Sequence, residues 1–196
     1  MNIVSQYKEY VHDYKTLKSR FKKLDITNTW QQVLTSRSTG IMGTGISFSS
    51  VCAEYKLNSD GTISLTNKAF DTDLKPVYIT GICKYLDPLV PTCRVVKFDK
   101  REFEGEYWII YVSKDLSTFV VGAPLIVLGK LIIPNVGLYV LTKNRDMYWK
   151  NDELQKEISK VLDDYGYTNY FNKPIFSGAS KPNVENGRFT TNKVTL

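Results

Sequence analysis

Histidine and cysteine are scarce in this sequence, and their scarcity excludes several kinds of site. Histidine occurs once, as His12, and cysteine three times, as Cys52, Cys83 and Cys93. Because the single histidine lies in the predicted N-terminal helix, a His-based catalytic triad is excluded, and one histidine cannot form a zinc site built on a histidine cluster. Three cysteines form no disulfide framework. We therefore predict a protein that is not an enzyme and that needs neither a metal nor a cofactor.

Long apolar runs and an export signal are also missing. No stretch of about 18 apolar residues could span a bilayer as a helix, and residues 1–7 lack the basic and apolar regions of a secretory signal. We therefore expect a cytoplasmic or membrane-peripheral protein, with a virion as a further candidate location. Cys83 and Cys93 flank a turn at Asp87-Pro88 and are expected to face each other across it, as a reduced pair rather than a disulfide.

The positive charge of the chain is confined to its two ends. Residues 1–25 carry six Lys/Arg and three Asp/Glu, residues 173–196 carry four Lys/Arg and one Glu, and residues 26–172 are neutral. Nucleic-acid binding requires positive charge concentrated on a docking face. We therefore do not expect nucleic acid as a partner, and we interpret the ends as solvated segments.

The sequence does contain enough apolar and aromatic residues for a packed β-protein. Apolar residues make up 42% of the chain and aromatic residues 13%, which favours a folded core and strands. From Trp30 onward, short segments with alternating polarity follow one another without crossover helices, which is typical of an antiparallel sandwich or an up-and-down barrel. The predicted strands are 30–34, 51–57, 62–69, 77–85, 93–99, 106–113, 118–122 and 138–143.

The N-terminal segment is predicted to form one amphipathic helix over residues 3–24. Its apolar residues recur at steps of three and four and form one seam. The seam either packs on the barrel or on a second copy of the chain, or it docks on a partner or an anionic membrane surface. The seam consists of Ile3, Tyr7, Tyr10, Tyr14, Leu17, Phe21 and Leu24.

The C-terminal third contains a second predicted helix and an unpatterned tail. The helix begins at Asp152 and ends at Gly166, and residues 173–196 are expected to be extended or disordered. This division gives an N-terminal helix over 1–25, a barrel with its C-terminal helix over 26–172, and a basic tail.

Two loops are unusual in composition. The glycine-rich stretch 39–45 is interpreted as an entrance loop. The very apolar link Leu125–Val136, ending at Gly137, is either an elongated final hairpin folded on the barrel or an exposed loop that contacts a membrane or partner.

Six segments, in order, resemble the lipocalin family, in particular the branch of bacterial outer-membrane lipocalins, plant temperature-induced lipocalins and apolipoprotein D. They are Asn28–Trp30, Val51–Leu57 with Asp60-Gly61, Gly105–Ile110, Val120–Pro124, Leu138–Lys143 and Asn151–Leu154. The resemblance implies an all-β fold, an eight-stranded up-and-down antiparallel barrel with a C-terminal helix packed on it. The chain departs from the family pattern at Asn28, Leu116 and Lys143, which stand for Gly, Tyr and Arg. Lys143 could still place a cation over Trp30 at the closed end of the barrel.

The period of two along each strand predicts which side chains line the barrel. The lining is mostly apolar with a few phenols, which is typical of a site for a fatty acid, phospholipid, sterol or pigment. Tyr107 and Tyr111 are the favoured ligand contacts, and Trp30 with Lys143 is assigned to closing the barrel. The predicted lining is Ala53, Tyr55, Leu65, Asn67, Val96, Phe98, Tyr107, Ile109, Tyr111, Phe119, Val121, Tyr139 and Leu141.

The sequence thus predicts binding, transport or storage of a small hydrophobic ligand. The alternative is a structural or interaction protein, such as a virion component, whose barrel is filled by its own aromatic side chains. A lipocalin-like enzyme is disfavoured because no nucleophile and base are paired in the sequence.

Overall fold

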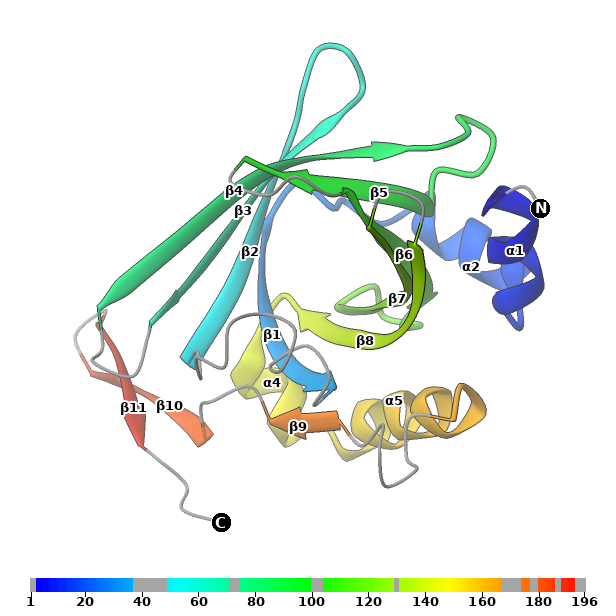
Figure 1. Cartoon of the computed structure of the whole chain (residues 1–196). Helices are drawn as coiled ribbons and strands as arrows, with labels where there is room; N and C mark the ends of the chain where they lie inside the picture. The colour runs from blue at the N-terminus through cyan, green and yellow to red at the C-terminus, as the bar shows by residue number, and fades with distance from the viewer. Residues whose placement is uncertain are drawn as a thin grey trace.

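Eight antiparallel strands form a barrel in the computed structural model (Figure 1). The structure describes residues 3–36, 49–70, 75–99, 104–128, 131–166, 174–176, 180–185 and 188–192. The strands are β1 (Thr29–Ser36), β2 (Ser49–Leu57), β3 (Ile63–Phe70), β4 (Pro76–Tyr85), β5 (Cys93–Phe98), β6 (Glu104–Val112), β7 (Thr118–Leu128) and β8 (Leu131–Thr142).

The barrel is closed by its first strand. Each strand from β2 to β8 pairs antiparallel with the next, and β1 pairs with both β8 and β2. Gln31 lies opposite Thr142 of β8, and Trp30 lies opposite Ala53 of β2. The prediction of an eight-stranded up-and-down barrel is therefore confirmed, and the rival two-layer sandwich is excluded.

One end of the barrel, at which β1 begins and β8 ends, is covered by the chain that leads into β1. We call it the closed end and the opposite one the far end. The carbonyl of Ile26 accepts a hydrogen bond from Trp30 Nε1 at 3.0 Å, and that of Asn28 accepts one from the Tyr55 amide at 3.2 Å. Leu24 and Ile26 are buried. This segment therefore forms the floor of the barrel.

The predicted helix over residues 3–24 is wrong in one respect, because it consists of two helices, α1 (Ile3–Tyr10) and α2 (Tyr14–Phe21). The cause is Asp13, whose side chain accepts a hydrogen bond from the amide of Thr16 at 3.0 Å and so caps a new helix. The apolar seam continues across the break, since Tyr7 and Leu17 are both buried.

Both helices pack on the outer face of the barrel, beside β6 (Figure 1). The hydroxyl of Tyr7 donates to the carbonyl of Ile109 at 2.8 Å, and its ring meets Trp108 edge-on with centroids 5.4 Å apart. The interpretation that the seam packs on the barrel is therefore confirmed, and the seam is part of the main core.

The C-terminal helix is present as predicted. It is α5 (Asp152–Asp164), it begins after the cap residue Asn151, and Gly166 behind it has a φ of 74°. A short helix that the sequence did not indicate, α4 (Arg145–Lys150), precedes it. The buried face of α5 consists of Leu154, Ile158, Val161 and Leu162. None of the described helices is both long and apolar enough to cross a membrane.

The last two strands form the elongated hairpin that was one interpretation of the apolar link. The backbone pairs Leu125 with Pro134 and Leu128 with Leu131. The side chains of residues 123–137 lie outside the described part of the structure, so membrane contact through Leu125–Val136 stays a prediction. The glycine-rich stretch 39–45 also lies outside it.

The tail contains strands of its own. β9 (Pro174–Phe176) pairs with β1, and β10 (Ser180–Glu185) pairs with β11 (Arg188–Asn192). The sheet thus continues past the predicted barrel boundary at residue 172.

Candidate functional site in the barrel interior

Aromatic side chains meet across the barrel in its closed half. The hydroxyls of Tyr55 on β2 and Tyr107 on β6 form a hydrogen bond. The rings of Trp30 on β1 and Phe119 on β7 pack edge-to-face with centroids 4.6 Å apart. Neither pair of strands is adjacent in the sheet, so both contacts span the bore. These four residues therefore face the interior.

From these four, the strand register identifies the other inward side chains, because residues directly opposite each other lie on one face of a sheet. Tyr55 lies opposite Leu65, for example, and Phe119 lies opposite Leu141. Every predicted lining residue except Tyr111 faces the interior by this criterion. These residues are Ala53, Tyr55, Leu65, Asn67, Val96, Phe98, Tyr107, Ile109, Phe119, Val121, Tyr139 and Leu141.

The prediction for Tyr111 is wrong, because this side chain lies outside the barrel. The register of β6 against β7 shifts between Ile109 and Tyr111, and an extra residue in one strand reverses the alternation beyond it. The Tyr111 hydroxyl accepts a hydrogen bond from Arg20 of α2 at 3.1 Å and donates one to Glu157 of α5. Tyr111 therefore ties two helices to the barrel and is no ligand contact.

The interior becomes more exposed toward the far end. On β4, Cys83 is 1% exposed, whereas Ile79, four residues nearer the far end, is half-buried. The same trend runs along β3, where Leu65 is 1% exposed and Asn67 half-buried. On β5, Phe98 is half-buried as well. The inner face of these strands is therefore less buried toward the far end.

Several inward positions between the closed half and the far half of the barrel are occupied by small residues. Ala53, Gly81, Val96 and Gly105 point to the interior by register. At Gly105, an added Cβ would find no atom closer than 3.9 Å, the distance to Val96 Cγ1. At Gly81 a Cβ would lie 2.6 Å from the carbonyl oxygen of Lys97 and 2.9 Å from the Phe98 ring. A methyl group at position 105 would therefore fit in ordinary van der Waals contact, whereas glycine at 81 allows the close approach of β5.

Strands β1 and β2 also separate toward the far end. They pair only over Thr29–Gln31 and Cys52–Glu54, and beyond these residues they diverge (Figure 1). Backbone pairing between β1 and β2 therefore joins the two edges of the sheet in the closed half of the barrel and not in the far half.

Burial keeps the interior phenols and the thiol neutral. Desolvation raises the pKa of Tyr139 to about 12 and that of Cys83 to about 11, and it raises the pKa of Tyr55 and Tyr107 as well. These groups act as hydrogen-bond donors at neutral pH, and the Cys83 thiol is a poor nucleophile because little thiolate forms.

Sequence reasoning missed Arg94, which lies on β5 opposite Tyr107 and Tyr85. It is 5% exposed and shares the inner face with Tyr107. The signal was present, because the alternation that placed Val96 and Phe98 inward places Arg94 inward too.

The closing residues behave as predicted. Trp30 is fully buried, and Lys143 Nζ lies 5.4 Å from the centroid of its ring. Lysine thus preserves a cation over the indole where the family pattern has arginine.

The two cysteines do not face each other. Cys83 lies opposite the inward Val96, whereas Cys93 lies opposite the outward Trp108. They therefore occupy opposite faces of the sheet, because Cys93 is an odd number of residues away from Val96, the partner of Cys83. Both are free thiols. Among the described residues, no group of three or more His, Cys, Asp or Glu side chains is placed to hold a metal.

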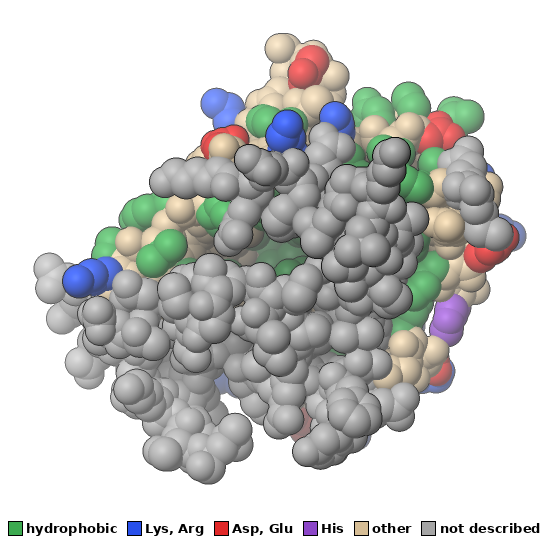
Figure 2. Space-filling view, in the orientation of Figure 1, with side chains coloured by type: hydrophobic (Ala, Val, Ile, Leu, Met, Phe, Trp, Pro, Cys, Tyr) green, Lys and Arg blue, Asp and Glu red, His purple; other side chains and the backbone are tan. Residues whose placement is uncertain are grey.

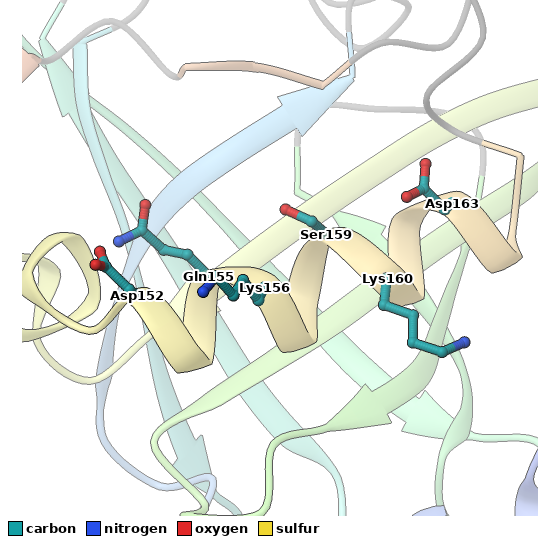
Figure 3. Close-up of a pocket in the computed structure, with 6 residues that line it drawn as sticks. All are labelled: Asp152, Gln155, Lys156, Ser159, Lys160 and Asp163. Carbon is teal, nitrogen blue, oxygen red and sulfur yellow. The ribbon is translucent and has the colours of Figure 1, made fainter.

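The outer surface has a concavity on α5 and some exposed apolar side chains. Figure 3 shows that the concavity, of about 390 Å³, is lined from one helix only, by polar side chains such as Gln155 and Ser159. Figure 2 shows apolar side chains on the flank of the barrel, and the exposed apolar residues of the chain include Tyr78, at 60%, and Leu89, at 75%. Neither feature encloses a ligand, and we take the barrel interior, whose lining is mostly apolar, as the candidate site.

Comparisons with known proteins agree with this architecture. Residues 44–127 match the family described as Lipocalin-like domain, and no curated protein sequence matches the chain. Lobster apocrustacyanin A1 has a TM-score of 0.55 at 12% identity, over 91% of this chain and 84% of that one. H1 crustacyanin from the lobster Homarus americanus has a TM-score of 0.56 at 10% identity, over 76% and 75%.

A third solved structure is the siderocalin Ex-FABP, with a TM-score of 0.50 at 13% identity, over 74% of this chain and 89% of that one. At these identities the likeness concerns the fold alone. The chain thus folds as a closed eight-stranded antiparallel barrel with helices before β1 and after β8, and its residues 44–127 are similar to a lipocalin-like domain.

Proposed function

We propose that the protein binds a small hydrophobic ligand in the far half of its barrel, for transport or storage. The observation that carries the proposal is the gradient of exposure along the inner face, from Cys83 and Leu65, each 1% exposed, to the half-buried Ile79, Asn67 and Phe98. We interpret these less buried inward residues as the surface that a ligand would cover.

The lining suits a ligand of the fatty-acid, phospholipid, sterol or pigment class. It is apolar, with the phenol of Tyr139 and the amide of Asn67 as orienting groups. Each buried methylene stabilises a complex by about 0.8 kcal/mol. Roughly ten of them therefore suffice for micromolar affinity after the cost of association.

The comparisons support binding rather than catalysis as the activity. The siderocalin Ex-FABP, which shares the fold, functions through dual ligand specificities. A relationship to the branch of bacterial outer-membrane lipocalins and apolipoprotein D stays a prediction. It is based on the segments Val51–Leu57 and Val120–Pro124.

A native mass spectrum of the full chain, purified without detergent and then titrated with palmitate, tests the proposal. We expect a one-to-one adduct, either carried through purification or formed on titration. A stable oligomer that carries nothing and takes up no palmitate would contradict it and would favour the structural alternative.

A pair of phenylalanine substitutions locates the binding in the interior. Val96→Phe adds volume on the inner face of β5, opposite Gly105. Ile82→Phe places the same side chain on the outer face of β4, where Ile82 is 41% exposed. We expect the first variant to lose the palmitate adduct and the second to keep it. Equal adducts in both would place binding elsewhere.

A further inference from the structure

Arg94 is a buried cation on the inner wall whose hydrogen bonds are incomplete. Its side chain is 5% exposed, and neither Nε nor Nη1 has a hydrogen-bond partner in the described structure. Nε carries one N–H and Nη1 carries two, so three of the five donors of the guanidinium are unused. The guanidinium is cationic, so this site holds a buried positive charge with unused hydrogen-bond donors.

The groups around Arg94 shield the charge without neutralising it. Its Cζ lies 5.6 Å from the centroid of the Tyr85 ring and 5.9 Å from that of Phe21, and its guanidinium is hydrogen-bonded to the neutral thiol of Cys83. None of the ion pairs found among the described side chains includes Arg94. An unpaired charge in such an environment is costly, and an anion that entered the barrel would relieve that cost.

The neighbouring phenols supply a further donor. Tyr107 lies opposite Arg94 across β5 and β6, and its hydroxyl shares one hydrogen bond with that of Tyr55. Two hydroxyls have two protons and use one between them, so the other is left for an acceptor. One step nearer the far end, the register places Ala53, Val96 and Gly105 on the inner face.

We infer that Arg94 is the receptor for an anionic head group, and that the ligand is a single-chain amphiphile with a carboxylate at one end. The carboxylate lies against the guanidinium and the phenol pair, and the hydrocarbon chain runs past Val96 toward the far end. Charge-assisted hydrogen bonds from a guanidinium to a carboxylate are among the strongest that proteins form. This inference rests on the proposed function and names the ligand class of the same site.

The test compares palmitate with hexadecanol, which has the same chain length and no charge. Wild type is expected to bind palmitate about 10- to 100-fold more tightly than hexadecanol at pH 8. Arg94→Met is expected to remove this preference by weakening palmitate binding alone, and Arg94→Lys to restore part of it. Arg20→Met, which removes a guanidinium from the outer face, is the matched control and should keep the preference.

The outcomes separate the inference from the proposed function. If wild type binds both ligands equally and Arg94→Met changes neither, the barrel binds lipids but Arg94 is no head-group receptor. If wild type binds neither, the proposed function itself fails.

Thermal unfolding of the ligand-free protein gives a second readout. Removing an unpaired buried charge should leave the Tm of Arg94→Met equal to or above that of wild type. A lower Tm together with an unchanged preference would show that Arg94 is structural and would overturn the inference.

Discussion

The closed half and the far half of the barrel are built from the same alternation of residues, yet they differ in what fills the bore. In the closed half, Trp30, Phe119 and the Tyr55–Tyr107 pair meet across it. In the far half, inward residues such as Ile79 and Phe98 are half-buried. Period two therefore determines which face a side chain occupies, while side-chain volume determines whether the bore is filled.

This difference separates stability from binding. The closed half is where the chain before β1, the indole of Trp30 and the seam of α1 and α2 pack together, so it should dominate the free energy of unfolding. The far half should contribute less to unfolding and most of the contact with a ligand.

The largest effect should come from deleting residues 1–24. This removes the buried side chains of Tyr7, Val11, Leu17 and Leu24, each of which contributes about 1.5–3 kcal/mol. Their sum is comparable to the stability of a whole domain, about 5–15 kcal/mol. We expect loss of cooperative urea unfolding. A barrel that keeps its unfolding midpoint would show that the helices are an appendage.

A finer version of the same test uses single residues of α2. Leu17→Ala should destabilise the protein by about 2–5 kcal/mol, since Leu17 is buried. Lys15→Ala, at an exposed position of the same helix, is the control and should change stability by less than about 0.5 kcal/mol.

Truncating one aromatic residue in each half contrasts the two directly. Trp30→Ala should cost about 3–5 kcal/mol, because a fully buried ring is lost with its contacts to Phe119 and its hydrogen bond to Ile26. Phe98→Ala, at a half-buried position, should cost clearly less, about 1–2 kcal/mol, and should weaken palmitate binding more. Urea unfolding and calorimetric titration measure both. Equal losses of stability would remove the distinction.

The phenol pair predicts an alkaline limit of stability. Tyr55 and Tyr107 have a raised pKa in the folded state because of burial. Their contribution is complete below pH 10, the ordinary pKa of tyrosine, and is lost above it, because only the unfolded state can then ionise. Each such group gives a slope of about 1.4 kcal/mol per pH unit.

The double variant Tyr55→Phe/Tyr107→Phe tests this limit. It should be nearly as stable as wild type at pH 7, since both partners of one hydrogen bond are removed together. Above pH 10 its free energy of unfolding should fall less steeply, by up to about 2.7 kcal/mol per pH unit. Identical slopes in urea titrations between pH 9 and pH 11 would show that these phenols ionise freely when folded.

The smallest effect is expected at the surface of the closed end. Lys143→Met removes the cation 5.4 Å from the Trp30 ring and should cost about 0.5–1 kcal/mol. Lys56→Met, at an exposed position on β2, provides the comparison. The difference between the two variants in urea unfolding measures the interaction, and no difference would mean that Lys143 contributes nothing.

Much of the fold could be predicted from the sequence because its signals are local. Alternating polarity predicted the eight strands, and Asp152 with Gly166 predicted the limits of α5. The lining followed from the same alternation for all residues but Tyr111. That residue failed because a shift in register between β6 and β7 depends on tertiary pairing, which no local pattern records.

The remaining features depend on contacts between distant segments. The break at Asp13 is a local capping signal, but it was hidden by a seam that continues across it. The positions of Cys83 and Cys93 on opposite faces depend on the length of the β4–β5 connection. The inward position of Arg94 was predictable from its alternation with Val96. Its unused hydrogen-bond donors, Nε and Nη1, depend on which residues surround it in the folded barrel.

The central claim is that the far half of the barrel interior holds the ligand. The most direct measurement is a titration of the isotope-labelled protein with palmitate, followed through its backbone amide NMR signals. We predict the largest shifts at inward positions, among them Ala53, Val96, Phe98 and Tyr139, and none along the polar face of α5 at Gln155 and Ser159. Shifts confined to the outer surface, or no shifts at saturating palmitate, would contradict the account.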